Sequence, residues 1–391
     1  MIRIAKVEAF AYRVPIAAPI KVAFGTFRDR PLVLVRVTDT DGAEGWGEAW
    51  CNWPAVGAEH RARLIADFGE RIIGENFDDP GEVFRRLDRE LEVLVLQTGE
   101  VGPIAQALAG IDIAVWDLAA RKAGLPLCRG IGGAPPDTVP VYATGINPDR
   151  PEVFALERRK EGHRAFKLKI GFGRDIDLRN LRALRAELGA DAVLMTDANQ
   201  SLALDEALAL ARDAAPLDLL WIEEPLRIDA PAADWERLAA HSPIPLAGGE
   251  NLRGPDLRAA VDGEVLRVIQ PDITKWGGIT GNLQLMRAAV ARGKMFCPHV
   301  FGGGVAVLAS LHLLAAVGGD GLLEFDCHPN AGRELVVGGL LPVRDGRVPV
   351  PQGLGLGAAP DTAALERYRT WPDLARARLS ADAACEGGDH A

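Results

Sequence analysis

Short apolar runs recur along the middle of the chain about every 25 residues, and this rhythm constrains the fold more than any other feature. Between most runs lie 12–20 residues with helical periodicity, such as 178–190 and 202–215. Eight strands that alternate with helices predict a closed parallel barrel. An open doubly wound sheet is the alternative, but residues 143–149 (ATGINPD) lack the glycine-rich phosphate loop that its first strand would need. The runs are Val139–Ala143, Ala165–Ile170, Ala192–Thr196, Leu219–Ile222, Ile244–Ala247, Val265–Ile269, Lys294–Cys297 and Gly321–Phe325.

The two ends of the chain follow other patterns. Ile4–Val14 and Leu32–Val37 read as strands, and a turn at 39–42 precedes a third strand. Residues 104–124 repeat apolar side chains at helical spacing and stop at glycine. We therefore expect three parts: an α+β domain over 1–125, a barrel over 126–331, and a C-terminal segment over 332–391 with two short strands returning to the first domain and a frayed tail.

Charge and cysteine content exclude several function classes. The 44 Lys and Arg against 54 Asp and Glu give a net charge of −10, so no basic field attracts nucleic acid or an anionic membrane. Five scattered cysteines argue against a disulfide framework or a zinc site and fit a reducing cytoplasm. The N-terminus reads as a first strand rather than a signal peptide, and no run of about 18 apolar residues predicts a membrane span. We expect a cytoplasmic homo-oligomer that binds a small molecule.

Ionisable residues follow the barrel strands in a regular series. One such residue ends each successive run from the second to the eighth, at spacings of 22 to 28 residues. A single charged residue after a strand is usually a helix cap, but a series of seven favours convergence on the barrel mouth, where barrel enzymes have their active sites. The seven are Lys169, Asp197, Glu223, Glu250, Asp272, His299 and Glu324.

Three of these carboxylates predict a metal site. Asp197, Glu223 and Glu250 come from neighbouring strands, where their negative charges repel and raise one another's pKa. A hard divalent cation relieves this repulsion, so we expect Mg²⁺, with Mn²⁺ as a possible substitute. Two-residue alternation favours Glu223 as the ligand and places Glu224 behind it. Asn199 either hydrogen-bonds a metal ligand or the substrate, or is a turn residue.

Two further pairs predict acid/base chemistry. Lys167 and Lys169 share a face of one strand, so their charges disfavour each other and lower a pKa, as a general base near neutral pH requires. Asp272 and His299 follow adjacent strands, where the carboxylate can hold the imidazole in one tautomer. Because the lysine strand lies across the barrel from these two, we expect a lysine and a histidine to face one carbon atom from opposite sides.

At these residues the chain resembles the enolase superfamily, in its mandelate racemase-like branch. The resemblance covers about residues 1–360 and implies an α+β capping domain, completed by the C-terminal segment, on a (β/α)7β barrel. It also implies Mg²⁺ bound by Asp197, Glu223 and Glu250. The matching motifs are GWGEAW (45–50), GIDIAVWDLAARKAG (110–124), KLK (167–169), TDANQS (196–201), WIEEP (221–225), GGEN (248–251), QPDITKWGG (270–278), PHVFG (298–302) and LLEFD (322–326).

The resemblance assigns roles to the other site residues. It implies Lys169 as one acid/base group, the His299–Asp272 pair as the second, and Glu324 as a hydrogen-bond donor to the substrate carboxylate. The muconate-lactonising branch carries lysine where this chain has Asp272, which argues against that chemistry here.

These roles imply removal of the proton α to a carboxylate through a stabilised enediolate. We favour dehydration of a sugar acid to a 2-keto-3-deoxy acid. One alternative is cycloisomerisation of an aldarolactone, because the chain also resembles galactarolactone cycloisomerases in YATG, KLKIGFG, AGGE, PHVFGGGV and EFDCHPN. The other is racemisation or epimerisation of a 2-hydroxy acid. A non-catalytic metal-binding relative, or a barrel aldolase or phosphoesterase, would not need both acid/base groups.

The resemblance implies substrate selection by two loops of the capping domain; the alternative is that their side chains serve only loop packing and surface charge. In Lys21–Arg30, Arg28 or Arg30 could pair with a distal substrate oxygen. In Cys51–Gly57, Asn52 and Trp53 are the candidate substrate-binding residues.

Overall fold

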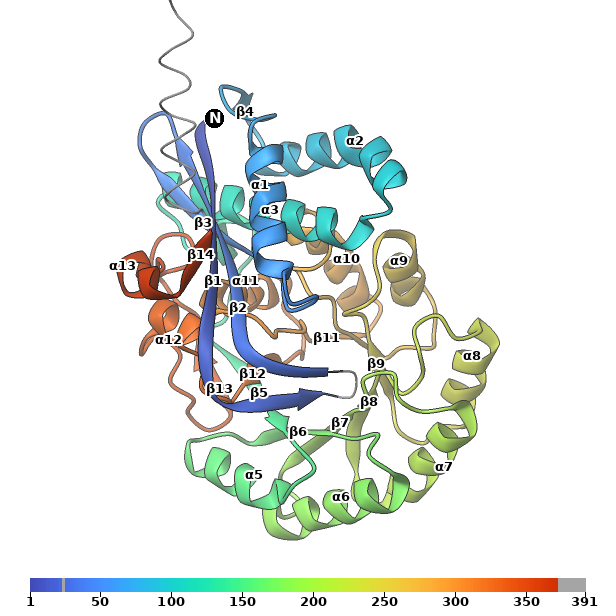
Figure 1. Cartoon of the computed structure of the whole chain (residues 1–391). Coiled ribbons are helices and arrows are strands. Elements are labelled where there is room, and N and C mark those ends of the chain that lie inside the picture. The colour runs from blue at the N-terminus through green and yellow to red at the C-terminus, as the bar shows by residue number, and fades with distance from the viewer. Residues whose placement is uncertain (23–24, 372–391) are drawn as a thin grey trace, which may run out of the picture.

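The chain forms an N-terminal α+β capping domain above a curled parallel sheet surrounded by helices (Figure 1). The computed structural model describes residues 1–22 and 25–371, so the tail expected to fray lies outside the described residues. An antiparallel sheet of order β14-β1-β2-β3, with β4 paired to β1, packs against three helices. These elements are β1 (Ile2–Val22), β2 (Gly25–Asp39), β3 (Glu44–Ala49), β4 (Asn76–Phe77), β14 (Arg369–Trp371), α1 (Gly57–Gly69), α2 (Pro80–Thr98) and α3 (Val101–Lys122).

The second part carries the predicted series of strands and helices, and each of the eight apolar runs overlaps a strand. The strand path is β11-β10-β9-β8-β7-β6-β5-β12. Its two ends share no backbone ladder in the described chain, and the Leu322 N–H meets Cys297 Sγ at 3.3 Å across the seam. The strands are β5 (Thr138–Ile146), β6 (Ala165–Lys169), β7 (Val193–Asp197), β8 (Leu219–Glu223), β9 (Leu246–Gly248), β10 (Val268–Ile269), β11 (Met295–Phe296) and β12 (Leu323–Asp326).

Helices cover the outside of this sheet and complete the α/β architecture (Figure 1). The fold class is therefore the predicted one. The helices after successive strands are α5 (Pro151–Lys160), α6 (Arg174–Leu188), α7 (Leu204–Ala214), α8 (Ala232–His241), α9 (Gly254–Asp262), α10 (Gly278–Ala291) and α11 (Gly304–Val317), and the shorter elements are α4 (Leu127–Gly130), α12 (Ala331–Val337), β13 (Arg347–Pro349) and α13 (Thr362–Leu365).

The interior of the curled sheet explains why the site lies where it does. A buried apolar layer includes Met195, Trp221, Cys297 and Leu322, and the rings of Tyr142 and Trp221 meet edge to face there at 5.5 Å. Alternate residues along a strand point to the same side. The residue two positions after each of these four therefore also points inward, in the next layer toward the carboxyl ends of the strands. These residues are all polar: Asp197, Glu223, His299 and Glu324, respectively.

Two local predictions are wrong. Residues 21–30 are expected as a loop, but those that the structure describes, 21–22 and 25–30, belong to strands β1 and β2, which pair from Ile4 to Val22 with a register shift between Pro15 and Ile20. One of the two short strands expected after residue 332 is instead helix α12, because the Asn330 side chain caps its first turn by accepting from Arg333 N–H. The other, β13, pairs with β5 of the parallel sheet, whereas β14 pairs with β1 of the capping domain.

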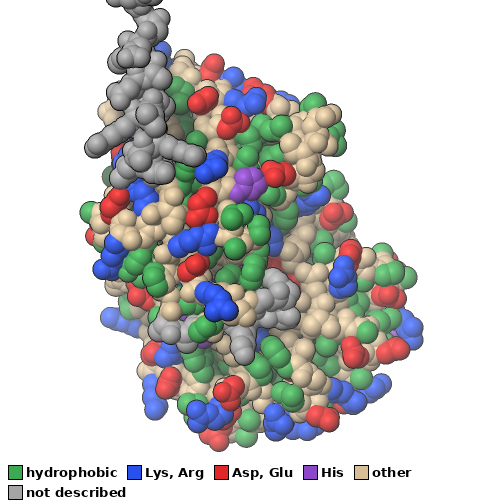
Figure 2. All heavy atoms as spheres, viewed as in Figure 1, with side chains coloured by type: hydrophobic (Ala, Val, Ile, Leu, Met, Phe, Trp, Pro, Cys, Tyr) green, Lys and Arg blue, Asp and Glu red, His purple; other side chains and the backbone are tan. Residues whose placement is uncertain are grey.

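Helix α3 is long and apolar enough by composition to cross a membrane, but 72% of its most apolar window is buried. It packs against β2 and β3 in the core of the capping domain, as a core helix of a soluble protein does. Basic and acidic side chains are interspersed over the face of the molecule shown in Figure 2.

Candidate active site

A cavity of about 890 Å³ lies between the mouth of the curled sheet and the capping domain. Five of the sequence-predicted residues line it from the sheet: Lys169, Asn199, Glu250, His299 and Glu324. The capping domain contributes Phe27, Trp50, Asn52 and Trp53.

Lys167 does not line this cavity itself but is fully buried in contact with Glu324, which does. Its Nζ lies 2.8 Å from Glu223 Oε2, 2.8 Å from Glu324 Oε1 and 3.6 Å from Asp197 Oδ2. Burial acts to lower the pKa of Lys167, but Glu223 and Glu324 outweigh burial and hold that pKa well above its ordinary value. Lys167 is therefore a fixed positive charge among three carboxylates.

Lys169 ends β6 in register with Asp197 at the end of β7, so the two side chains pair. Its Nζ also donates to Asn199 Oδ1 at 2.9 Å. Burial acts to lower the pKa of Lys169, but the Asp197 carboxylate raises it above the ordinary lysine value. The expectation that the lysine pair lowers a pKa is thus wrong for the protein without metal, because the carboxylates outweigh the repulsion between the two ammonium groups.

Asp197, Glu223 and Glu250 provide the oxygen donors of the predicted metal site. Asp197 and Glu223 are direct partners in the β7–β8 ladder, and Glu250 follows the adjacent strand β9. Burial and the Asp197 carboxylate raise the pKa of Glu223 to about 7. Burial would also raise the pKa of Asp197, but Lys169 and Lys167 outweigh it and lower that pKa.

The donor chemistry fits a hard divalent cation. As the side chains stand, no three His, Cys, Asp or Glu residues in the described ranges converge on one metal position. Instead, the Lys167 ammonium lies between Glu223 and Asp197 and stands in for a cation there. An all-carboxylate set that is mostly buried and lies beside other cations is the environment that Mg²⁺ or Mn²⁺ suits.

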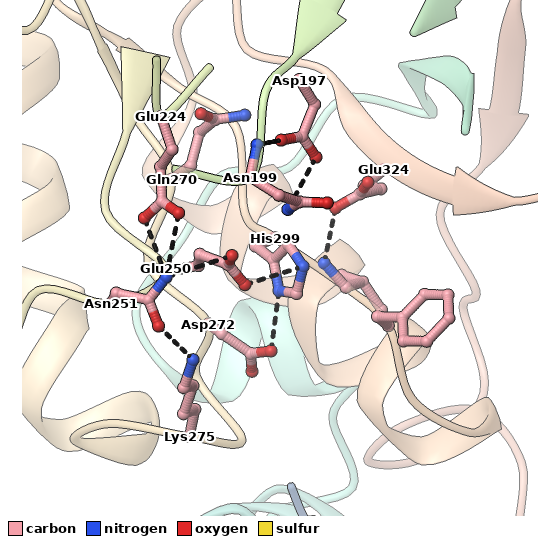
Figure 3. Close-up of polar contacts among 12 residues, drawn as sticks. Asp197, Asn199, Glu224, Glu250, Asn251, Gln270, Asp272, Lys275, His299 and Glu324 are labelled. Atoms are coloured by element: carbon pink, nitrogen blue, oxygen red, sulfur yellow. Dashed lines mark hydrogen bonds and ion pairs between the residues drawn. The ribbon is translucent and has the colours of Figure 1, made fainter. Parts of the chain in front are cut away.

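His299 connects the second predicted acid/base pair to these carboxylates (Figure 3). Its Nδ1 lies 2.9 Å from Asp272 Oδ2 and its Nε2 lies 3.1 Å from Glu250 Oε2. Asp272 is held in turn by the Thr274 N–H at 2.9 Å and hydroxyl at 2.6 Å. Burial acts to lower the pKa of His299, but Glu250, Glu324 and Asp272 outweigh it and raise that pKa to about 10.

The two acid/base candidates reach the cavity from well-separated strands. Lys169 ends β6 and His299 follows β11, with β7 to β10 between them in the sheet. Glu324 on β12 accepts from the Val300 N–H at 2.9 Å and from Lys167, so its expected donor role stays a prediction.

The predicted substrate-binding arginines do not line the cavity. Arg30 is buried, with Nη2 2.5 Å from Asp326 Oδ2 and its guanidinium 4.3 Å from the centre of the Phe301 ring. Arg28 is exposed on β2 and is also absent from the lining. Asn52 and Trp53 do line the cavity. The Asn52 side chain donates to the Phe301 carbonyl at 2.9 Å.

Sequence reasoning gave no role to several side chains that support the site. Gln270 Nε2 donates to Glu223 Oε2 at 2.8 Å, and its place two residues before Asp272 was an available signal. Asn251 Nδ2 donates to both oxygens of Glu224 at 2.9 Å and to Glu250 Oε1 at 3.2 Å. Glu224 thus lies behind the cluster, and burial and Glu250 hold its pKa well above the ordinary value.

Comparison with known proteins gives a consistent result. The mandelate racemase/muconate lactonizing enzyme N-terminal domain model matches residues 4–132, and the enolase C-terminal domain-like model matches residues 152–364. D-galactarolactone cycloisomerase of Agrobacterium fabrum is 34% identical over 370 residues, which span 90% of this chain and 94% of the relative. L-talarate/galactarate dehydratase of Salmonella typhimurium is 31% identical over 379 residues, or 92% of this chain and 88% of the relative.

Solved structures agree with these relatives. A mandelate racemase/muconate lactonizing enzyme from Bordetella bronchiseptica RB50 has a TM-score of 0.87 at 46% identity, covering 94% of this chain and 99% of its own. A variant of L-talarate/galactarate dehydratase liganded with Mg and L-glucarate has a TM-score of 0.83 at 28% identity, covering 94% and 92%. The chain belongs to the mandelate racemase/muconate lactonizing enzyme family of the enolase superfamily.

Proposed function

We propose that this protein is a Mg²⁺-dependent enzyme that removes the proton α to the carboxylate of a sugar acid and expels a β-hydroxyl as water, giving a 2-keto-3-deoxy acid. The observation that carries the proposal is the pair of acid/base candidates, Lys169 and His299, that line one cavity together with Glu250, beside the buried carboxylates of Asp197 and Glu223. The relatives include sugar-acid dehydratases and cycloisomerases, which supports the same class of chemistry.

The chain's own residues account for the proton movements. One of Lys169 and His299 takes the α-proton, and the electron pair of the broken C–H bond moves onto the carboxylate. The buried Lys167 ammonium, 2.8 Å from Glu324, supplies positive charge where that negative charge develops. The other acid/base group gives a proton to the β-hydroxyl, the C–O bond breaks, water leaves, and the resulting enol becomes the 2-keto acid.

Asp197, Glu223 and Glu250 would hold the metal, and Mn²⁺ is a possible substitute. A bound Mg²⁺ supplies positive charge and Lewis acidity toward the substrate carboxylate. Asp272 holds the His299 ring through Nδ1 and so leaves Nε2 toward the cavity. A cytoplasmic location and a homo-oligomeric assembly stay predictions from the sequence.

Cycloisomerisation of an aldarolactone is the second candidate, favoured by the relative that is 34% identical. It uses the same first step, but the ring oxygen of the lactone leaves in place of water. Its product therefore keeps the mass of the substrate, whereas a dehydration product loses the mass of one water.

The test is a panel of sugar acids and their lactones incubated with the protein and Mg²⁺ in D2O. We expect deuterium at the α-carbon or a 2-keto product by NMR with at least one compound, and the product mass separates the two candidates. EDTA should abolish the reaction and added Mg²⁺ should restore it. Full turnover in metal-free protein, or no exchange with any member of the panel, would contradict the proposal.

A further inference from the structure

The cavity wall carries one cation that the proposed chemistry does not use. Of the lysine and arginine side chains that line the cavity, Lys169 pairs with Asp197, and Arg227 pairs with Asp229 at 2.6 Å on the exposed rim. Lys275, which follows β10, also lines the cavity. Within the described ranges its ammonium group forms no ion pair with a carboxylate within 4.0 Å, although its charge acts with that of His299, against burial, to lower the pKa of Glu250.

Neighbouring side chains hold Lys275 in place. Its residue is only 8% exposed, and its Nζ donates to Asn251 Oδ1 at 2.6 Å (Figure 3). The same Nζ lies 4.9 Å from the centre of the Trp50 ring and 6.0 Å from that of Trp276. The Asn251 amide is itself held by hydrogen bonds to Glu224, so the acceptor of the Lys275 hydrogen bond has a fixed orientation.

In this environment the Lys275 ammonium group keeps N–H donors that a ligand in the cavity could use. An ammonium group has three N–H donors, and Asn251 accepts one of them. The aromatic faces attract the positive charge but do not replace a carboxylate oxygen as an acceptor. A cation sheltered from water binds an anionic oxygen more strongly than a neutral hydroxyl, because charge-assisted hydrogen bonds strengthen where the dielectric is low.

We propose that Lys275 is a specificity-determining residue that binds the second carboxylate of a dicarboxylate sugar acid, or of its lactone, at the end away from the reacting carbon. This inference rests on the proposed function, since the reacting carboxylate is taken to lie at the Lys167 and metal-ligand cluster. A monocarboxylate sugar acid offers a hydroxyl at that end. The enzyme should therefore prefer aldarates to aldonates.

The experiment compares acids that share their stereocentres and differ only at the far carbon, beginning with galactarate and galactonate. Their dissociation constants are measured by calorimetry with Mg²⁺ in D2O, for the wild type and for Lys275→Met and Lys275→Gln. The Gln variant removes the charge and keeps an N–H donor, on a side chain one bond shorter. Arg253→Met is the matched control, because Arg253 lies 5.4 Å from the Trp276 ring but is exposed and outside the cavity lining.

We expect the wild type and Arg253→Met to bind the dicarboxylate more tightly than the monocarboxylate by a factor on the order of 10 to 100. Both Lys275 variants should lose that factor while keeping wild-type affinity for the monocarboxylate, which also shows that they are folded. The inference is overturned if the wild type shows no preference for dicarboxylates, or if either variant keeps the preference. NMR of the recovered acids tests the proposed function separately. Tight binding without α-deuterium or a keto product would contradict that function, but the measured preference for dicarboxylates would still test the role of Lys275.

Discussion

Lys169 and His299 come from strands that lie on either side of the strands leading to Asp197, Glu223 and Glu250. Each is tied to a different carboxylate, Lys169 to Asp197 and His299 to Asp272. On the proposed mechanism, we expect each side chain to reach only one face of a planar centre formed between them. The two groups should be separable by mutation, because neither holds the other in place.

We predict that in D2O Lys169→Ala exchanges the α-proton only of the epimer presented to His299, and that His299→Asn exchanges only the other. Loss of a positioned general base should slow exchange at its own face by roughly 10²–10⁴-fold. NMR of substrate recovered at intervals measures both rates. Lys160→Ala, on exposed helix α5, should exchange as the wild type does. Equal exchange of both epimers by either site variant would contradict the opposed arrangement.

The positions of the strand-end residues could be predicted because side chains alternate along a strand and parallel strands share one end. Asp197 and Glu223 needed nothing more than that rule to be placed side by side. Arg30 could not be placed in this way, because its partner Asp326 is 296 residues away in sequence and only the fold brings the two together. Lys275 was equally out of reach, since its neighbours Asn251 and Trp50 come from two other loops.

Among the elements, β3 of the capping domain has an unexpected connection to α11 of the barrel. The Glu48 carboxylate is buried and accepts from the backbone N–H groups of Gly303, at 2.5 Å, and Ala306, at 2.9 Å, at the start of α11. These donors lie just after the loop that carries His299. Trp50 N–H also donates to the Thr274 carbonyl at 3.0 Å, beside Asp272. This one segment of the capping domain thus contacts both loops of the His299–Asp272 pair.

We predict that Glu48→Gln destabilises the protein by about 1–3 kcal/mol, because an amide cannot accept from both backbone donors. It should also lower kcat, since the loop after His299 loses its anchor. Urea unfolding and steady-state kinetics measure the two effects. Glu44→Gln on the same strand is the control, because Glu44 is partly exposed and pairs at the surface with Arg36 at 3.2 Å. A Glu48→Gln protein as stable and active as the wild type would show that the anchor is dispensable.

The repeated strands and helices could be predicted from periodicity, whereas the irregular elements could not. The arms of the β1–β2 hairpin contain Pro15 and the register shift near it, which interrupt the alternation that marks a strand. Helix α12 is only seven residues long, too short for a helical period to stand out, although its Asn330 cap was visible in the sequence. Strand β14 is three residues long and is defined by its pairing with β1, which sequence alone does not display.

At the scale of the whole molecule, the cavity exists because the capping domain is held on the sheet by buried polar contacts. Asp117 of α3 accepts from the Trp46 N–H at 2.8 Å and the Leu356 N–H at 2.7 Å, so one carboxylate ties β3 to the C-terminal segment. Asp112, also on α3, accepts from the Thr280 N–H at 2.9 Å and from its hydroxyl on α10. The relative position of the two parts therefore depends on carboxylates taken out of water.

Asp112 should make the stability of the whole molecule depend on pH. Burial raises the pKa of Asp112 to about 7, against about 3.9 in an unfolded chain. Between these values the folded protein holds a proton that the unfolded chain has released, so stability falls as pH rises from about 4 to about 7.

Asp112→Asn removes this contribution, and its amide can still accept from the Thr280 N–H. From pH 5 to pH 7 the wild type should therefore lose about 2–3 kcal/mol more unfolding free energy than the variant does. Urea unfolding followed by tryptophan fluorescence at the two pH values measures this difference. Asp67→Asn, at an exposed position on α1, should keep the wild-type dependence. Parallel pH dependence in the wild type and Asp112→Asn would mean that this carboxylate is ionised in the folded protein and that the joint between α3 and α10 holds a buried charge.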